Sequence, residues 1–204
     1  EFPFGFPKIN GKTTFAYAAS DRVINISKKT TKEVIVDISA PTIKPVFKGE
    51  HYFSRNIHYI RMMTEIMFDI KDNLSGVQGM SYTLDAQMPV MENKAFSIPQ
   101  EGLHEVSYAA VDNVNNKAEA KKMSLFVDEK PPQIFHHFSV TQTEPGQEIY
   151  PTKVLLYLAS TDKQSGIRKI TYQINNGSVI TYKSAALLFN KPGTYKVEIK
   201  SIDN

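Results

Sequence analysis

The sequence predicts an all-β protein made of tandem antiparallel β-sandwiches, and three observations support this. First, one glycine-to-aspartate segment occurs three times at a spacing of 91 residues (193 − 102 = 91): Gly11–Asp21, Gly102–Asp112 and Gly193–Asp203. Second, short segments of alternating apolar and polar residues are separated by turn-forming residues. Third, no segment shows the 3.6-residue period of a helix. A repeat of about 90 residues suits one small sandwich.

The repeat divides the chain into three expected domains. Residues 1–38 are predicted to form the C-terminal hairpin of a truncated unit, residues 39–129 a complete sandwich, and residues 130–204 a sandwich without its last strand. A proline-containing stretch recurs at both boundaries, in residues 36–43 and 127–134. Proline cannot donate to a strand ladder and therefore ends the outgoing strand. We expect the first and last units to be incomplete and the chain to be a piece of a longer polypeptide.

The first expected element is a hairpin. Residues 12–20 alternate well enough to form one strand, and residues 22–25 form a turn. Residues 32–38 form the returning strand, in which Val34 and Val36 share a face. A two-stranded hairpin is only marginally stable alone, so other segments are expected to complete its sheet.

The second unit contains the clearest alternation. Ile66, Phe68 and Ile70 occupy every second position and predict a half-buried strand. A turn is expected to follow at residues 72–77, because it contains the Ser75-Gly76 pair. The later elements are expected as a strand at 80–84, a loop at 85–93, a short strand at 96–98, a strand at 102–112 and a closing strand at 122–127.

The third unit repeats these elements. Its turn, residues 162–167, again contains a Ser-Gly pair, and a strand is expected at residues 170–174. Asn175-Asn176-Gly177 predicts a tight hairpin turn, since these residue types accept positive φ angles. A short strand at 186–189 and a last strand that ends at Asp203 complete the expected order.

Composition excludes several classes of function. The net charge of +3 is too small to indicate nucleic-acid binding or attraction to a membrane. The absence of cysteine excludes disulfides, thiol catalysis and cysteine-ligated zinc. No apolar run reaches the roughly 18 residues of a transmembrane helix. Neither a nucleophile elbow nor a glycine-rich phosphate loop occurs, so the sequence does not indicate an enzyme.

A recurring motif resembles a known family. In order it reads Asp72, Ser75-Gly76, Tyr82, Gly102, Tyr108, Asp112-Asn113, Val127-Asp128 and Pro131-Pro132. This pattern resembles bacterial immunoglobulin-like (Ig-like) surface repeats, including a family usually labelled an outer-membrane "beta-barrel domain". The resemblance covers nearly the whole chain. It implies tandem Ig-like sandwiches in an extracellular, cell-surface or periplasmic protein. The chain departs from the family in having Asn115-Asn116 where Gly-Asn is common.

Aspartates recur where strands are expected to end. The main candidates are Asp72, Asp112 and Asp128, and the related positions are Asp21, Asp37, Asp162 and Asp203. Calcium takes six to eight oxygen ligands, so aspartates gathered from several strand ends predict a structural calcium site. The alternative is that each aspartate caps its own turn by accepting backbone N–H groups. No dense acidic run favours calcium over capping.

Residues 49–64 form an aromatic-rich loop in the predicted structure. Its candidate contact residues are Tyr52, Phe53, His58, Tyr59, Arg61 and Met62. Aromatic residues with arginine and methionine are typical of surfaces that contact other proteins. The alternative is that the segment folds over a sandwich edge as a short strand.

The sequence therefore predicts a non-catalytic module for adhesion, protein–protein assembly or spacing at a bacterial surface. Its expected partners are another protein or further repeats of the same polypeptide, and nucleic acid is not among them. The alternative is an accessory Ig-like region of a larger secreted enzyme whose catalytic domain lies outside this chain.

Overall fold

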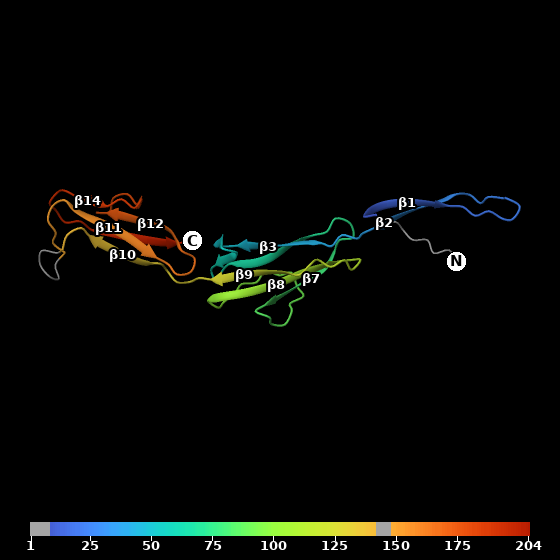
Figure 1. The fold of residues 1–204 in the computed structure, drawn as a ribbon, viewed down its shortest axis with the longest axis horizontal. Coiled ribbons are helices and arrows are strands. Elements are labelled where there is room, and N and C mark those ends of the chain that lie inside the picture. The colour runs from blue at the N-terminus through green and yellow to red at the C-terminus, as the bar shows by residue number, and fades with distance from the viewer. Residues whose placement is uncertain (1–8, 142–147) are drawn as a thin grey trace. The chain divides into compact units, whose positions relative to one another are not determined.

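The computed structural model describes residues 9–141 and 148–204 (Figure 1). Over these residues the protein is all-β, with several small antiparallel sheets and no helix. The described part of the chain thus contains no helix that is long and apolar enough to cross a membrane. Residues 1–8, which begin the first predicted domain, and residues 142–147 of the third lie outside the described residues.

The chain divides into two compact units, and each is described by itself. Unit 1 comprises residues 1–48, 65–97 and 104–124, and unit 2 comprises residues 49–64, 98–103 and 125–204. The three domains predicted from the repeat, with boundaries after residues 38 and 129, stay a prediction.

Within its described residues, unit 1 contains three antiparallel strand pairs. Strand β1 (Gly11–Tyr17) pairs with β2 (Thr30–Val36), and β3 (Thr42–Lys48) pairs with β6 (Glu65–Lys71). Strand β7 (Val77–Leu84) pairs with β8 (Gly102–Asp112), with a bulge near the start of β7. The hairpin predicted near the N-terminus is therefore confirmed, whereas β3 was not predicted. Pro45, which lies opposite Phe68, interrupts the alternation of apolar and polar residues that would have indicated this strand.

The core of unit 1 is aromatic. Ile66 and Phe68 are buried while their neighbours in β6 are exposed, which confirms the predicted half-buried strand. The Phe68 ring lies 4.8 Å from the ring of Tyr108 and 5.9 Å from that of Tyr82, centroid to centroid. Tyr82 stacks in turn on Phe96 at 4.4 Å. Residues 96–98 do not form the predicted strand, because Phe96 makes only a single bridge to Ile66.

Unit 2 contains two three-stranded sheets. One has the order β10 (Gln133–Phe138), β11 (Val154–Thr161), β14 (Leu187–Phe189), and the other has the order β13 (Ile180–Thr181), β12 (Ile167–Ile174), β15 (Val197–Asp203). Val154, Leu156, Leu158 and Phe189 form its buried cluster, and Tyr172 packs against them. Asn175 and Asn176 have φ angles of 49° and 59°, which confirms the predicted tight turn after β12.

The segment predicted as a loop, residues 49–64, is a β-hairpin in unit 2. Strand β4 (His51–Ser54) pairs antiparallel with β5 (Ile57–Ile60). The turn between them places Arg55 and Asn56 at φ angles of 52° and 62°. Arginine is not a typical residue for such a turn, which explains why the sequence pattern did not predict a hairpin here. Strand β9 (Lys121–Val127), the predicted closing strand, is also present.

Candidate functional site

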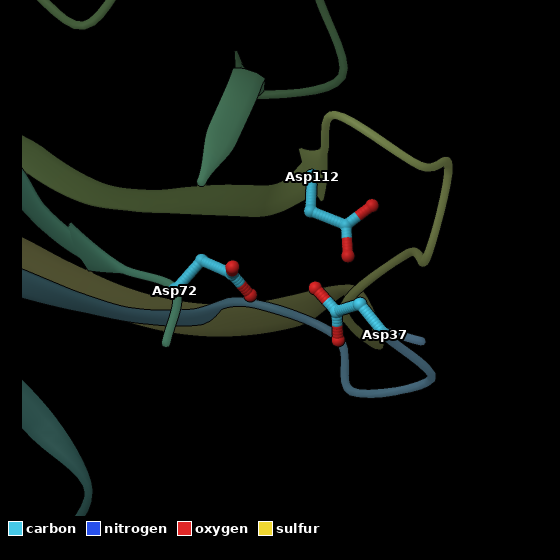
Figure 2. Close-up of side chains that lie close together, drawn as sticks. All are labelled: Asp37, Asp72 and Asp112. Carbon is cyan, nitrogen blue, oxygen red and sulfur yellow. The ribbon is translucent and has the colours of Figure 1, made fainter. Parts of the chain in front are cut away.

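Six aspartates form two clusters, one in each unit. Asp37, Asp72 and Asp112 make the first cluster, and Asp128, Asp162 and Asp203 make the second. Within each cluster every residue offers a carboxylate oxygen, and these oxygens lie within 4.8 Å of one another. Figure 2 shows the three carboxylates of the first cluster converging from separate segments of the chain.

Strand ends bring the first cluster together. Asp37 directly follows β2, Asp72 directly follows β6, and Asp112 is the last residue of β8. Asp37 joins two of these segments. Its Oδ1 accepts the N–H of Ser39 (3.0 Å), and its Oδ2 accepts the N–H of Ser75 in the turn after β6 (2.9 Å).

The other two carboxylates of this cluster each hold a turn. Asp72 Oδ1 accepts the N–H groups of Leu74 (3.1 Å) and Gly76 (2.8 Å), and Gly76 adopts a φ of 82° that favours glycine. No hydrogen bond within the described residues involves Asp72 Oδ2. Asp112 Oδ1 accepts the N–H of Asn116 (2.7 Å), and Oδ2 accepts its side-chain amide (2.7 Å).

The second cluster reproduces the hydrogen bonds that Asp72 and Asp37 make in the first. Asp162 Oδ1 accepts the N–H groups of Gln164 (3.0 Å) and Gly166 (2.8 Å), and Gly166 again has a φ of 82°. Asp128 Oδ2 accepts the N–H of Ser165 (3.1 Å), as Asp37 accepts that of Ser75. The repeated sequence motif is therefore also a repeated structural motif.

Each cluster has beside it a serine whose hydroxyl oxygen, Oγ, is buried: Ser75 in the first and Ser165 in the second. The Ser75 hydroxyl acts on the Asp37 carboxylate and is the largest cause of the lowered pKa of Asp37. The Ser165 hydroxyl has no hydrogen-bond partner among the described residues. Ser165 is only 7% exposed. It lines a pocket of about 200 Å³ together with Asp128 and Asp203.

The carboxylates of the clusters differ in how strongly the protein favours their ionised forms. Burial raises the pKa of Asp203, and the nearby charges of Asp128 and Asp162 raise it further. Burial also opposes ionisation of Asp112, but hydrogen bonds from Asn116 outweigh it and hold that pKa below its ordinary value. None of the ion pairs found among the described residues includes an aspartate of either cluster.

The structure regroups the aspartates predicted as calcium ligands. Asp72 and Asp112 do lie together, but Asp128 belongs to the other cluster. Asp37 takes the third place beside Asp72 and Asp112. Sequence alone did not group them because Asp37 and Asp112 are far apart in the chain. The repeat does relate the two clusters, since Asp37 and Asp128 occupy equivalent positions in it.

The predicted contact residues lie on and beside the β4–β5 hairpin. Tyr52 is the cross-strand neighbour of Tyr59, and the Tyr59 ring lies 6.0 Å from the ring of Phe126. Phe53 is the cross-strand neighbour of His58, with ring centroids 4.5 Å apart. Both faces of the hairpin therefore carry aromatic side chains.

The predicted contact residues differ in the fraction of each side chain that is exposed to solvent. Phe53 is 54% exposed and Tyr52 is 37% exposed, while His58 and Tyr59 are half-buried. Met62 is half-buried as well, and its neighbour Met63, which the sequence analysis did not single out, is 87% exposed. No signal in the sequence distinguished these two methionines.

Glu129 ties the end of the hairpin to the segment after β9. Its Oε2 accepts a hydrogen bond from Arg61 Nη2 (2.6 Å), and its Oε1 accepts the backbone N–H of Met62 (2.8 Å). The Arg61 hydrogen bond is the largest cause of a lowered Glu129 pKa. Arg61 is therefore a positioning residue of the hairpin as well as a candidate contact residue.

Comparison of the sequence with models of known protein families, and with curated proteins, finds no match. The two aspartate clusters and the aromatic hairpin are the features of the chain that indicate a function.

Proposed function

We propose that the chain is a non-catalytic, Ig-like repeat module of a bacterial cell-surface or other extracytoplasmic protein, and that it contacts proteins through the β4–β5 hairpin. The observation that carries the proposal is the exposed aromatic surface of the hairpin, formed by Tyr52 and Phe53. Adhesion to another protein and assembly with further repeats of the same polypeptide both use such a surface.

The repeated turn supports the Ig-like part of this proposal. Both units contain the same aspartate turn before a strand, and both strands, β7 and β12, have a bulge directly after it. Bulges of this kind re-aim a strand at a sheet edge and recur within a family of domains. A unit that repeats this much local geometry is expected to repeat its sandwich as well.

The composition of the hairpin supports the contact part. Large aromatic side chains lose little conformational entropy when a partner covers them, and aromatic and arginine residues dominate the energetics of interfaces. Phe53 is held by its ring contact with His58, and Arg61 is held by Glu129. These contacts keep the side chains in defined positions before a partner binds, which lowers the entropic cost of binding.

Photo-cross-linking tests the proposal in cells that make the parent protein. Phe53 is replaced by p-benzoylphenylalanine, and the same amino acid at Ile35 of β2, which is also exposed, serves as the control. We expect position 53 to yield a specific cross-linked protein that position 35 does not. A product joined to a different protein indicates adhesion or assembly, and one joined to another part of the same polypeptide indicates spacing. Identical products, or none, from the two positions would contradict the proposed contact surface.

A double variant tests whether the aromatic side chains themselves make the contact. Tyr52→Ser with Phe53→Ser should abolish a cross-link made from position 63, which lies beside the hairpin and is highly exposed. Ile35→Ser should leave that cross-link unchanged. Retention of the product in the double variant would assign the contact to other residues.

A further inference from the structure

We propose that each aspartate cluster binds one calcium ion, so that the chain has two structural calcium sites built from equivalent residues of the repeat. This inference is independent of the proposed contact surface. It rests on the geometry of the carboxylates, on the buried hydroxyl of Ser165, and on a comparison with Asp21.

The spacing of the carboxylate oxygens suits calcium. Calcium–oxygen distances are about 2.3–2.6 Å, so two ligands on opposite sides of one ion lie about 5 Å apart. The three oxygens of each cluster lie within 4.8 Å of one another, and a single ion can therefore contact all three. Main-chain carbonyls and water are the usual sources of the remaining ligands.

The buried hydroxyl of Ser165 is a second and independent observation. A buried hydroxyl without a hydrogen bond is destabilising, so such groups are rare unless something else satisfies them. Ser165 lines the pocket beside Asp128 and Asp203, and its hydroxyl has no partner. The hydroxyl of Ser75, at the equivalent position of the first cluster, lies beside Asp37. A bound cation, or a water molecule in its shell, supplies the missing partner of Ser165.

Turn capping alone does not account for the clusters. Asp21 caps its turn by accepting the N–H groups of Val23 and Asn25 (both 2.9 Å), and it belongs to neither cluster. A capped turn of this kind therefore does not require other carboxylates beside it. Asp72 and Asp162 use only Oδ1 for their turns, which leaves Oδ2 of each for a metal ion.

The charge of the first cluster also favours a cation. Ionised carboxylates this close together repel one another unless a cation lies between them. The second cluster differs, because Arg61 and Arg168 both line its pocket, and only Arg61 is paired, with Glu129, in the part of the chain that the structure describes. Among the described residues, no lysine or arginine lies within ion-pair distance of an aspartate in the first cluster. A divalent ion offsets this repulsion in the first cluster.

Titration calorimetry of the whole chain with calcium chloride tests the proposal. Asp72→Asn and Asp162→Asn are the informative variants, because the amide oxygen keeps the turn's hydrogen bonds while the charge and one ligand are lost. We expect calcium to bind at least about tenfold more weakly at each altered site. At concentrations that just saturate the unaltered protein with two ions, each single variant should therefore bind one ion and the double variant none. Asp21→Asn is the matched control and should still bind two.

Melting with calcium and with a chelator provides a second measurement. Calcium should raise the melting temperature of the unaltered chain and of Asp21→Asn, and should not change that of the double variant. Absence of binding at about 10 mM calcium, tenfold above the weak end of the range for extracellular modules, would overturn the proposal. Full binding by the double variant would overturn it too, and equally tight binding of magnesium would overturn the choice of calcium.

Discussion

Asp21 and Asp112 hold the same turn at equivalent positions of the repeat. Each carboxylate accepts the N–H groups of the residues two and four positions later, and each Oδ2 accepts the side-chain amide of an asparagine, Asn25 or Asn116. Even the residue with positive φ recurs, with Ile24 at 71° and Asn115 at 69°. Only Asp112 lies in a carboxylate cluster. The repeat therefore preserves a turn, and the surroundings decide what else that turn can do.

This pair allows capping to be measured separately from metal binding. Asp21→Ala removes the acceptor of the Asn25 N–H, and that amide should exchange with solvent faster because its hydrogen bond is lost. Asp21→Asn should retain most of the protection. Hydrogen exchange followed by NMR gives both values. Equal protection of the Asn25 amide in all three proteins would show that the carboxylate does not hold the turn.

The aromatic core of unit 1 should tolerate little change. Phe68 is 2% exposed and contacts the rings of Tyr82 and Tyr108, so Phe68→Ala should destabilise the protein by about 3–5 kcal/mol. Met67, on the opposite face of β6, is 41% exposed, and Met67→Ala should cost less than about 0.5 kcal/mol. Urea denaturation measures both. Equal losses would mean that β6 does not have one buried and one exposed face.

Asp203 should make the metal-free protein less stable as pH rises. Its folded-state pKa is raised above the ordinary value of 3.8 by burial and by Asp128 and Asp162. Its favourable contribution is therefore fully present below pH 3.8 and is lost as pH rises through the folded-state pKa. In the presence of chelator, Asp203→Asn should be more stable than the unaltered protein at pH 7, and the difference should diminish toward pH 3. If the stability difference between Asp203→Asn and the unaltered protein does not change with pH, the raised pKa of Asp203 is not its cause.

The histidines of the β4–β5 hairpin should make the protein less stable as pH falls, which is the opposite of the effect of Asp203. His51 Nε2 and His58 Nδ1 lie 2.8 Å apart, and burial lowers the pKa of both rings, with the charge of His51 lowering that of His58 further. The unfolded chain therefore binds protons more readily, and the hairpin should lose stability as pH falls below about 6.5 and through the folded-state values. Amide exchange in β5 as a function of pH measures this, and His58→Gln should weaken the dependence. If the pH dependence of β5 amide exchange is the same in His58→Gln, groups other than His58 cause the loss of stability at low pH.

Glu129 should hold the end of the hairpin. Glu129→Ala removes the acceptor of both Arg61 Nη2 and the Met62 N–H, so the Met62 amide should exchange faster. Glu119→Ala is a suitable control because Glu119 is exposed and makes no ion pair among the described residues. The same Met62 exchange rate in both variants would show that the Glu129 contact is not needed.

Local pattern was sufficient to predict much of the β structure. Strand β6 was predictable because burial alternates with a period of two, and the turns after Asp72 and Asp162 were predictable because Ser-Gly permits the positive φ that they need. Where a local signal was weak, prediction failed. Pro45 interrupts β3, and Arg55-Asn56 is an unusual turn between β4 and β5.

The grouping of side chains from distant parts of the chain depended on tertiary structure. The sequence showed that aspartates end strands, but Asp37, Asp72 and Asp112 meet only because β2, β6 and β8 end at the same place. Likewise the sequence marked residues 49–64 as aromatic-rich, whereas strand pairing decided that Phe53 is exposed and that Tyr59 is half-buried. The alternation of apolar and polar residues along a strand determines which residues share a face. Contacts between residues far apart in sequence determine which strand ends come together, and these contacts cannot be predicted from a local pattern.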